Sequence, residues 1–307
     1  MVLEIYQAGI LLIIGALVGI SISFVGQTGQ GVVLPIILLF TGDAFLAIAI
    51  NLLNDLITSS VVSIGYIKKG EFKIRKDILI IIVIAIIISL LGVFILLTTP
   101  IGNIYGWFIP LFITILGIIF LYRGFPTKET LTKTAQKLSS RYLKKSIDTE
   151  VLEKEQQKYD EEILTLENDI EELTPTRSRV FYILALIFGI FIGINSGLFG
   201  ANSGFIIVLA LVIIYGYPIK KSVGTALILS IIMCLSTFLI YQIFGIMIKG
   251  QFFFNLEISL YLAIGSIVTG ITMTIYVQKL SAKTMGRGVG LVIFILGIIS
   301  LIFYFIS

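Results

Sequence analysis

A glycine pattern that interrupts an apolar run occurs twice in this chain, with the two copies 174 residues apart. The first copy lies at 15–31 and the second at 189–204, and Gly42 and Gly216 extend the match downstream. Within a bilayer, non-helical backbone is tolerated only where protein covers it or where it lines a cavity. Glycine breaks at corresponding places in two halves of a chain are the best sequence indication of a secondary transporter's substrate site. We therefore predict that the two breaks share one central cavity.

The composition indicates a membrane protein. The 307 residues are 57% hydrophobic and 13% charged, whereas soluble domains are about 45–50% apolar even when glycine is counted. Nearly all charged residues fall between the apolar runs, so the net charge of +4 reflects loop composition. We expect an all-α, polytopic protein that is surrounded by the lipid bilayer and has no role in nucleic-acid binding.

The apolar segments fall into two length classes. They run over 8–24, 32–41, 44–67, 78–98, 104–122, 180–199, 205–215, 222–248, 255–278 and 288–306. A helix needs about 20 residues to span a bilayer, so 32–41 and 205–215 are too short. Each short segment follows one glycine break. We predict that each forms, with the segment before it, either a re-entrant hairpin or two helices meeting in a broken turn near mid-membrane.

Loop charges predict the topology. When 68–77 is placed in the cytoplasm, 21 of the 22 Lys and Arg residues lie on that side, as the positive-inside rule requires. Both termini then lie outside the cell membrane, and 124–179 is cytoplasmic. The first half, 1–123, begins outside and the second half, 180–307, begins inside. We therefore predict two transmembrane repeats of inverted topology.

The segment 124–179 between the two halves is a charged insertion. Its apolar residues keep a spacing of three and four over about three heptads, as in an amphipathic helix or coiled coil. They are Leu152, Tyr159, Ile163, Leu166, Ile170 and Leu173. We expect this helix to lie on the cytoplasmic face or to pack on a partner subunit, for example in a homodimer. A regulatory coiled coil is the alternative.

Asp55 is the one acidic residue deep in a predicted span, with Asn51 one helical turn before it and Asn54 beside it. A carboxylate in a span costs about 2.5–3.5 kcal/mol on insertion scales, which makes it a functional candidate. Burial favours the protonated form of a carboxyl group, so Asp55 is a candidate coupling residue. A structural role near the broken helix and direct contact with substrate or ion are the alternatives. Leu229 stands at the matching position 174 residues later.

The two glycine turns carry polar residues that are not ionisable. They are Gln27, Thr28 and Gln30 around Gly29 in the first turn, and Asn202 and Ser203 before Gly204 in the second. A short helix that starts after such a turn points backbone N–H groups and the positive end of its dipole into the break. This arrangement predicts an anion site without a buried Lys or Arg. Close helix packing, as in small-xxx-small motifs, is the alternative for the glycines.

The spans lack the residues that catalysis or metal binding requires. The chain has no histidine, and its one cysteine, Cys234, lies in an apolar run, where a small buried hydrophobe is the expected role. No nucleophile–base pair, paired carboxylate or Cys/His ligand cluster appears within the apolar segments. We therefore expect no enzymatic activity, no cofactor and no metal.

The residues in and after the two turns resemble a known family. The stretch 26–35, Gly-Gln-Thr-Gly-Gln-Gly-Val-Val-Leu-Pro, is similar to the first glycine-rich signature of the sulfite exporter TauE/SafE family. The stretches 200–208 and 216–226, the latter with Thr225, resemble the second signature. The likeness covers both membrane halves and excludes 124–179. It implies export of small sulfur oxyanions such as sulfite or sulfonates.

Together, these observations favour a secondary transporter that exports a small anionic, sulfur-containing substrate. The anion is expected at the centre between the turns, held by backbone N–H groups and by Gln27, Thr28, Asn202, Ser203 and Thr225. A passive anion channel is one alternative, and it would need a continuous pore without a coupling residue. A membrane scaffold or sensor that acts through 124–179 is the other.

Overall fold

The computed structural model describes residues 5–26, 30–98, 179–200 and 203–281, with isolated positions at 114–118 and 284–302. These residues form eight α-helices and one π-helical turn, and no strand occurs among them. In chain order, the elements are α1 (Ile5–Val25), α2 (Gln30–Thr41), α3 (Ala44–Lys68), α4 (Lys76–Thr98), α8 (Arg179–Phe199), α9 (Gly204–Tyr215), α10 (Ile219–Phe244), η2 (Gly245–Lys249) and α11 (Leu256–Val277).

The helices follow the predicted apolar segments closely. Five of them are long and apolar enough to cross a membrane, namely α1, α3, α4, α10 extended by η2, and α11. The two short segments are confirmed as 12-residue helices, α2 and α9. The predicted segments 104–122 and 288–306 and the insertion 124–179 lie outside the continuously described residues.

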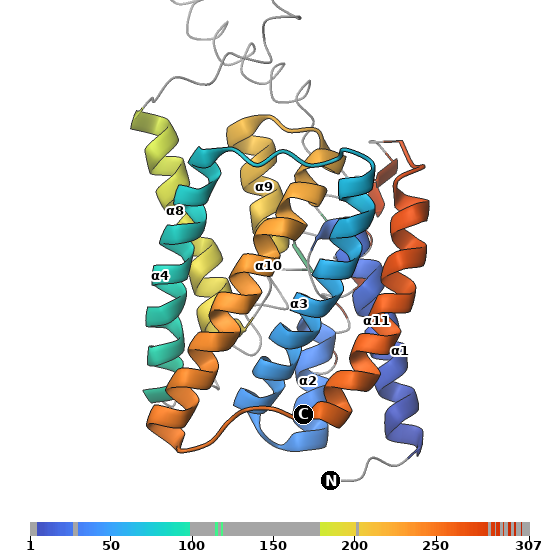
Figure 1. Cartoon of the computed structure of the whole chain (residues 1–307), viewed down its shortest axis with the longest axis vertical. Coiled ribbons are helices and arrows are strands. Elements are labelled where there is room, and N and C mark those ends of the chain that lie inside the picture. The colour runs from blue at the N-terminus through green and yellow to red at the C-terminus, as the bar shows by residue number, and fades with distance from the viewer. Residues whose placement is uncertain are drawn as a thin grey trace, which may run out of the picture.

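The helices run along one bundle axis (Figure 1). Helix α1 starts at the end of the bundle where the N-terminus lies, and α2 returns towards that end before α3 crosses to the other. Helix α8 starts at the opposite end of the bundle. Helix α9 returns towards the end where α8 starts, and α10 then crosses to the other end. The loops α3–α4 and α9–α10 therefore share one end of the bundle, whereas the loops α2–α3 and α10–α11 share the other.

The glycines upstream of the turns allow helices to pack at short distance. Gly15 and Gly19 of α1 lie against backbone atoms of α11, where an added Cβ would collide with Leu262 or Ser266. Gly193 of α8 lies against α4, and an added Cβ would sit 2.6 Å from the carbonyl oxygen of Ala85. These glycines therefore serve close helix packing, as small residues do in membrane helix pairs. The resulting pairs are α1 with α11 and α4 with α8.

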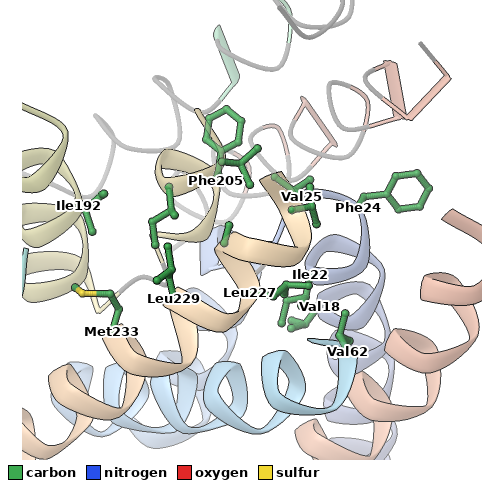
Figure 2. Packing of buried hydrophobic residues seen from close by; sticks show 14 of the residues in the cluster. Val18, Ile22, Phe24, Val25, Val62, Ile192, Phe205, Leu227, Leu229 and Met233 are labelled. Carbon is green, nitrogen blue, oxygen red and sulfur yellow. The ribbon is translucent and has the colours of Figure 1, made fainter. Parts of the chain in front are cut away.

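The apolar core joins helices from both ends of the sequence. Figure 2 shows Val18 and Ile22 of α1 near Val62 of α3, in a cluster that extends to Leu227 of α10 and Ile192 of α8. All five side chains are at most 1% exposed. Many large apolar side chains on the outer surface are exposed, as expected for helices that face lipid.

Two tyrosines anchor the same kind of contact in both halves. The Tyr66 hydroxyl donates a hydrogen bond to the Ser23 carbonyl at 2.7 Å, and the Tyr241 hydroxyl donates to the Gly197 carbonyl at 2.9 Å. Both side chains are fully buried. The first bond ties the last turn of α1 to α3, and the second ties the last turn of α8 to α10. In each half, a tyrosine of the long helix thus holds the end of the helix that precedes the glycine turn.

Candidate functional site

The two glycine turns meet inside the bundle. The carbonyl oxygen of Gly26, at the end of α1, touches Gly204, the first residue of α9, so closely that no side chain fits at position 204. Gly26 and Gly200 both have positive φ, at 72° and 58°, a conformation that glycine adopts without strain. The structure thus brings the start of one glycine turn into contact with the helix that begins after the other.

Ser203 holds the start of α9 to α8. Its hydroxyl donates to the Ile192 carbonyl at 2.8 Å and accepts a hydrogen bond from the Asn195 amide at 3.2 Å. The side chain is fully buried. Because the single hydroxyl hydrogen is already used, Ser203 offers no further donor to a ligand.

Several predicted site residues lie beyond the described part of the chain. Gln27, Thr28 and Gly29 of the first turn and Asn202 of the second fall outside the described residues. Gln30 is described as the first residue of α2. The sites assigned to these residues from the sequence stay predictions.

Thr225 is buried in α10 and contacts the loop that follows α3. Its hydroxyl accepts a hydrogen bond from the Lys73 N–H at 2.9 Å. The neighbouring Gly224 lies against the Glu71 carbonyl, with no room for a side chain. Within the same turn of α10, Ala226 lies 3.8 Å from the Cβ position of Gly26. Thr225 therefore holds the 71–75 loop, while its neighbour borders the glycine turn.

Asp55 lies in the middle of α3, as predicted, and its side chain is 0% exposed. It is the only charged side chain among the buried residues that the structure describes. Helix α3, which carries Asp55, packs against both α10 and α11. A buried carboxylate without comparable buried charges is costly, so its position calls for a function or a strong local partner.

Two buried asparagines flank Asp55 on α3. The Asn51 amide donates to the Gly200 carbonyl at 3.0 Å, so this side chain reaches the second glycine turn. Its Oδ1 has no hydrogen-bond partner among the described residues. The Asn54 Oδ1 accepts from the Ser266 hydroxyl of α11 at 3.0 Å, and the Asn54 Nδ2 has no partner in the same set. An unmade hydrogen bond of a buried polar group costs about 1–3 kcal/mol. The Asn51 Oδ1 and the Asn54 Nδ2 are therefore candidates for contact with a ligand.

Ser230 of α10 is a candidate that the sequence did not reveal. Its Oγ lies 3.0 Å from the Cβ position of Gly204, is fully buried, and has no hydrogen-bond partner among the described residues. Counted from the first residues of α3 and α10, Ala44 and Ile219, the position of Asp55 matches Ser230, whereas the sequence comparison at an offset of 174 residues pairs it with Leu229.

The one-residue difference arises in the turns before these helices. One residue, Asp43, separates Gly42 from α3, whereas Tyr217 and Pro218 separate Gly216 from α10. Asp55 therefore corresponds to Ser230. Comparing the two turns residue by residue would have revealed this shift in the sequence.

Apart from Lys249, the basic residues in and between the labelled helices gather at one end of the bundle (Figure 1). Lys68, Lys73 and Arg75 lie at the end of α3 and in the loop after it, and the Lys220 ammonium donates to the Gln278 carbonyl at 2.8 Å. No Lys or Arg is among the buried residues that the structure describes. The described neighbours of the glycine turns are therefore backbone groups, apolar side chains and the neutral polar side chains of Asn51 and Ser230.

Comparison with known proteins identifies one family. The model of the family described as "Sulfite exporter TauE/SafE" matches residues 11–299. The match includes both glycine turns and all helices described above except the first residues of α1. No curated protein and no solved structure matches this chain.

Proposed function

Because the chain belongs to the sulfite exporter TauE/SafE family and is thus a membrane transporter of sulfite or related anions, we propose that it is a secondary exporter of sulfite or an organosulfonate. The observation that carries the proposal is the contact between Gly26 and Gly204, which joins the two turns of the family signature. Two broken helices that meet inside a bundle are the usual setting of a transporter's substrate site. The family is one of transporters, so no enzymatic activity is proposed.

The anion is proposed to bind between the two glycine turns. Helices α2 and α9 begin directly after these turns, and the first N–H groups of a helix have no acceptor within the helix. The positive ends of both dipoles favour negative charge there. The proposed binding residues are Gln27, Thr28, Gly29, Gln30, Asn202, Ser203, Gly204 and Thr225.

These residues are proposed to take two roles. An oxyanion needs hydrogen-bond donors, and Ser203 already donates its hydroxyl hydrogen to Ile192. Thr225 is occupied with the backbone of Lys73. We assign these two to positioning the turn and the loop, and the donor role to Gln27, Thr28 and Asn202.

The two membrane halves, 1–123 and 180–307, are proposed to be inverted repeats. Three observations support this. The positive-φ glycines Gly26 and Gly42 recur as Gly200 and Gly216. The Tyr66 hydrogen bond recurs at Tyr241. The first helix of each half packs on the fourth of the other half, α1 on α11 and α8 on α4.

We further propose that both termini face the outside of the cell membrane and that the insertion 124–179 is cytoplasmic. The basic residues at one end of the bundle support this orientation, because cytoplasmic loops carry an excess of Lys and Arg. Only Lys249 lies at the other end among the described basic residues (Figure 1).

Ligand-induced stabilisation tests the substrate class. The purified full-length protein is heated with sulfite, sulfate, thiosulfate, taurine, sulfoacetate or sulfur-free acids, because binding raises stability by RT ln(1 + [L]/Kd). We expect saturable stabilisation by sulfite or a sulfonate. Stabilisation by none of the sulfur anions would overturn the proposal.

Two substitutions test the location of the site. Asn202→Leu and Thr28→Val each remove one donor to a charged ligand, which costs about 1.5–3 kcal/mol or roughly ten- to hundredfold in affinity. Thr272→Val is the matched control, since this hydroxyl is exposed and bonds only within α11. Unchanged affinity in both test variants would assign the turns to packing.

A further inference from the structure

A buried hydroxyl group lies at the start of α9 without a hydrogen-bond partner. It belongs to Ser230 of α10, whose side chain is 0% exposed. The Ser230 Oγ lies 3.0 Å from the Cβ position of Gly204, the first residue of α9. No donor or acceptor for this hydroxyl occurs among the residues that the structure describes. The cost of removing it from water is therefore not offset within the described protein.

Other buried hydroxyl groups in the bundle are hydrogen-bonded. Thr237 bonds with Ser89 of α4 at 3.0 Å and with Ser196 of α8 at 2.8 Å, and all three are 0% exposed. Among the Ser and Thr residues that the structure describes, Ser230 is the only one whose buried hydroxyl has no partner. Because buried polar groups are normally paired, this exception calls for a ligand or another explanation.

The helix start that Ser230 faces is not capped by its own N-cap side chain. Ser203 is the N-cap of α9 and makes no side-chain bond to the α9 backbone, because its hydroxyl donates to the Ile192 carbonyl. By contrast, the N-cap side chains of α3 and α11, Asp43 and Asn255, both accept from backbone N–H groups. The positive end of the α9 dipole thus lies in a buried place without an acceptor from its N-cap.

A neutral donor beside the positive end of a helix dipole favours an anion. The Ser230 hydroxyl can donate one hydrogen bond, and negative charge is stabilised at the N-terminus of a helix. Apolar neighbours lower the local dielectric, which strengthens such a bond. Val208 and Ala226 provide this environment, at 3.7 and 3.8 Å from the Cβ position of Gly26.

The same surroundings limit the size of the group that can reach Ser230. The Gly26 carbonyl lies against Gly204, so no side chain fits at position 204. A compact group of oxygens on sulfur, which sulfite and sulfonates share, is therefore the part of the anion that we expect beside Ser230. The organic part of a sulfonate would have to lie elsewhere.

We propose that the Ser230 hydroxyl donates a hydrogen bond to an oxygen of the transported anion, which lies at the N-terminus of α9. The inference rests on the proposed anion transport and adds a binding residue that lies outside both glycine turns. The anion supplies the acceptor that Ser230 lacks, and the α9 dipole stabilises its charge.

The variant Ser230→Ala tests the proposal in the purified full-length protein. Sulfite is the probe, and taurine replaces it if only sulfonates stabilise the wild type. The apparent Kd, measured from ligand-induced stabilisation, should rise about tenfold or more, because a bond to a charged ligand is lost. Without the anion, the Tm should equal or exceed that of the wild type, since the change removes no bond within the protein.

Ser89→Ala is the matched control, because Ser89 is equally buried and is bonded to Thr237. It should show the opposite pattern, with a Tm lower by about 2–4 °C and an unchanged Kd. An unchanged Kd in Ser230→Ala would assign Ser230 to packing or to an ordered water. A fall in the Tm of Ser230→Ala as large as that of the control would show that its hydroxyl is bonded within the protein. Either result would overturn the inference.

The structure of the wild-type protein with the bound probe supplies a test that does not depend on any variant. An oxygen of the anion should lie about 2.5–3.0 Å from the Ser230 Oγ. An anion bound between the glycine turns without contact to Ser230 would overturn this inference and leave the proposed function intact. Stabilisation of the wild type by no sulfur anion would instead overturn the proposed function.

Discussion

At the scale of single residues, the contact between Gly26 and Gly204 leaves no space for a methyl group, whereas Gly9 of α1 has open space around its Cβ position. We predict that Gly204→Ala destabilises the protein by about 3 kcal/mol, because backbone atoms would have to move apart. Gly9→Ala should be neutral or stabilising by about 0.5–1 kcal/mol, since alanine favours a helix. Thermal unfolding in detergent measures both. Equal Tm values for the two variants would contradict the contact.

The two buried tyrosines allow a symmetric test. Tyr66→Phe and Tyr241→Phe each remove a hydroxyl and leave a buried carbonyl without its donor. Each is predicted to cost about 1–3 kcal/mol, and the two costs should be similar. Tyr276→Phe is the control, because this side chain is 56% exposed, and it should change Tm little. A large cost in only one of the two tests would argue against equivalent roles in the two halves.

At the scale of helices, the sequence was sufficient to predict most boundaries and insufficient to predict partners. The apolar runs 44–67 and 205–215 became α3 and α9 with one-residue differences, because length and apolarity decide where a chain can cross or enter a bilayer. The pairing of α1 with α11 was not predicted. Lipid is as apolar as leucine, so packing faces depend on small residues and polar contacts.

In the candidate site, too, single residues could be predicted from the sequence, whereas their contacts could not. Asp55 stood out because charge is rare in a span, and its burial is confirmed. The contact from Asn51 to Gly200 could not be predicted, since it joins residues 149 apart in the chain. Ser230 was missed because a single extra residue before α10 shifts the register, and a one-residue shift moves a side chain to another face of a helix.

One side chain fixes the loop between α10 and α11. Gln242 donates to the Phe253 carbonyl and accepts from the Phe253 N–H, both at 2.9 Å, so it replaces two backbone partners. Gln242→Leu is predicted to cost about 2–3 kcal/mol, because both buried backbone groups lose their partner. Hydrogen exchange at the Phe253 amide should accelerate in this variant. Gln251→Ala, at an exposed position in the same loop, is the control, and comparable exchange at Phe253 in the two variants would contradict this role.

At the scale of the whole molecule, the first helix of each half packs against the fourth helix of the other half. Neither half is therefore expected to be stable alone. Helix α1 buries its glycines against α11, and α8 buries its glycines against α4. Separating the halves would expose both glycine faces and the contact at Gly204. The two turns are thus held in contact by packing from both halves, as the proposed anion site between them requires.

The orientation of the molecule in the membrane gives the last prediction. Phe72 and Phe252 lie in loops at opposite ends of the bundle and are 38% and 57% exposed, so they form a matched pair for cysteine labelling. The one native thiol, Cys234, is fully buried and is replaced by alanine in the background. Because the basic loop 69–75 is expected in the cytoplasm, a membrane-impermeant maleimide added to intact cells should label Phe252→Cys but not Phe72→Cys. Permeabilised cells should show labelling of both variants, which controls for accessibility. Labelling of Phe72→Cys alone in intact cells would reverse the orientation and place the insertion 124–179 outside.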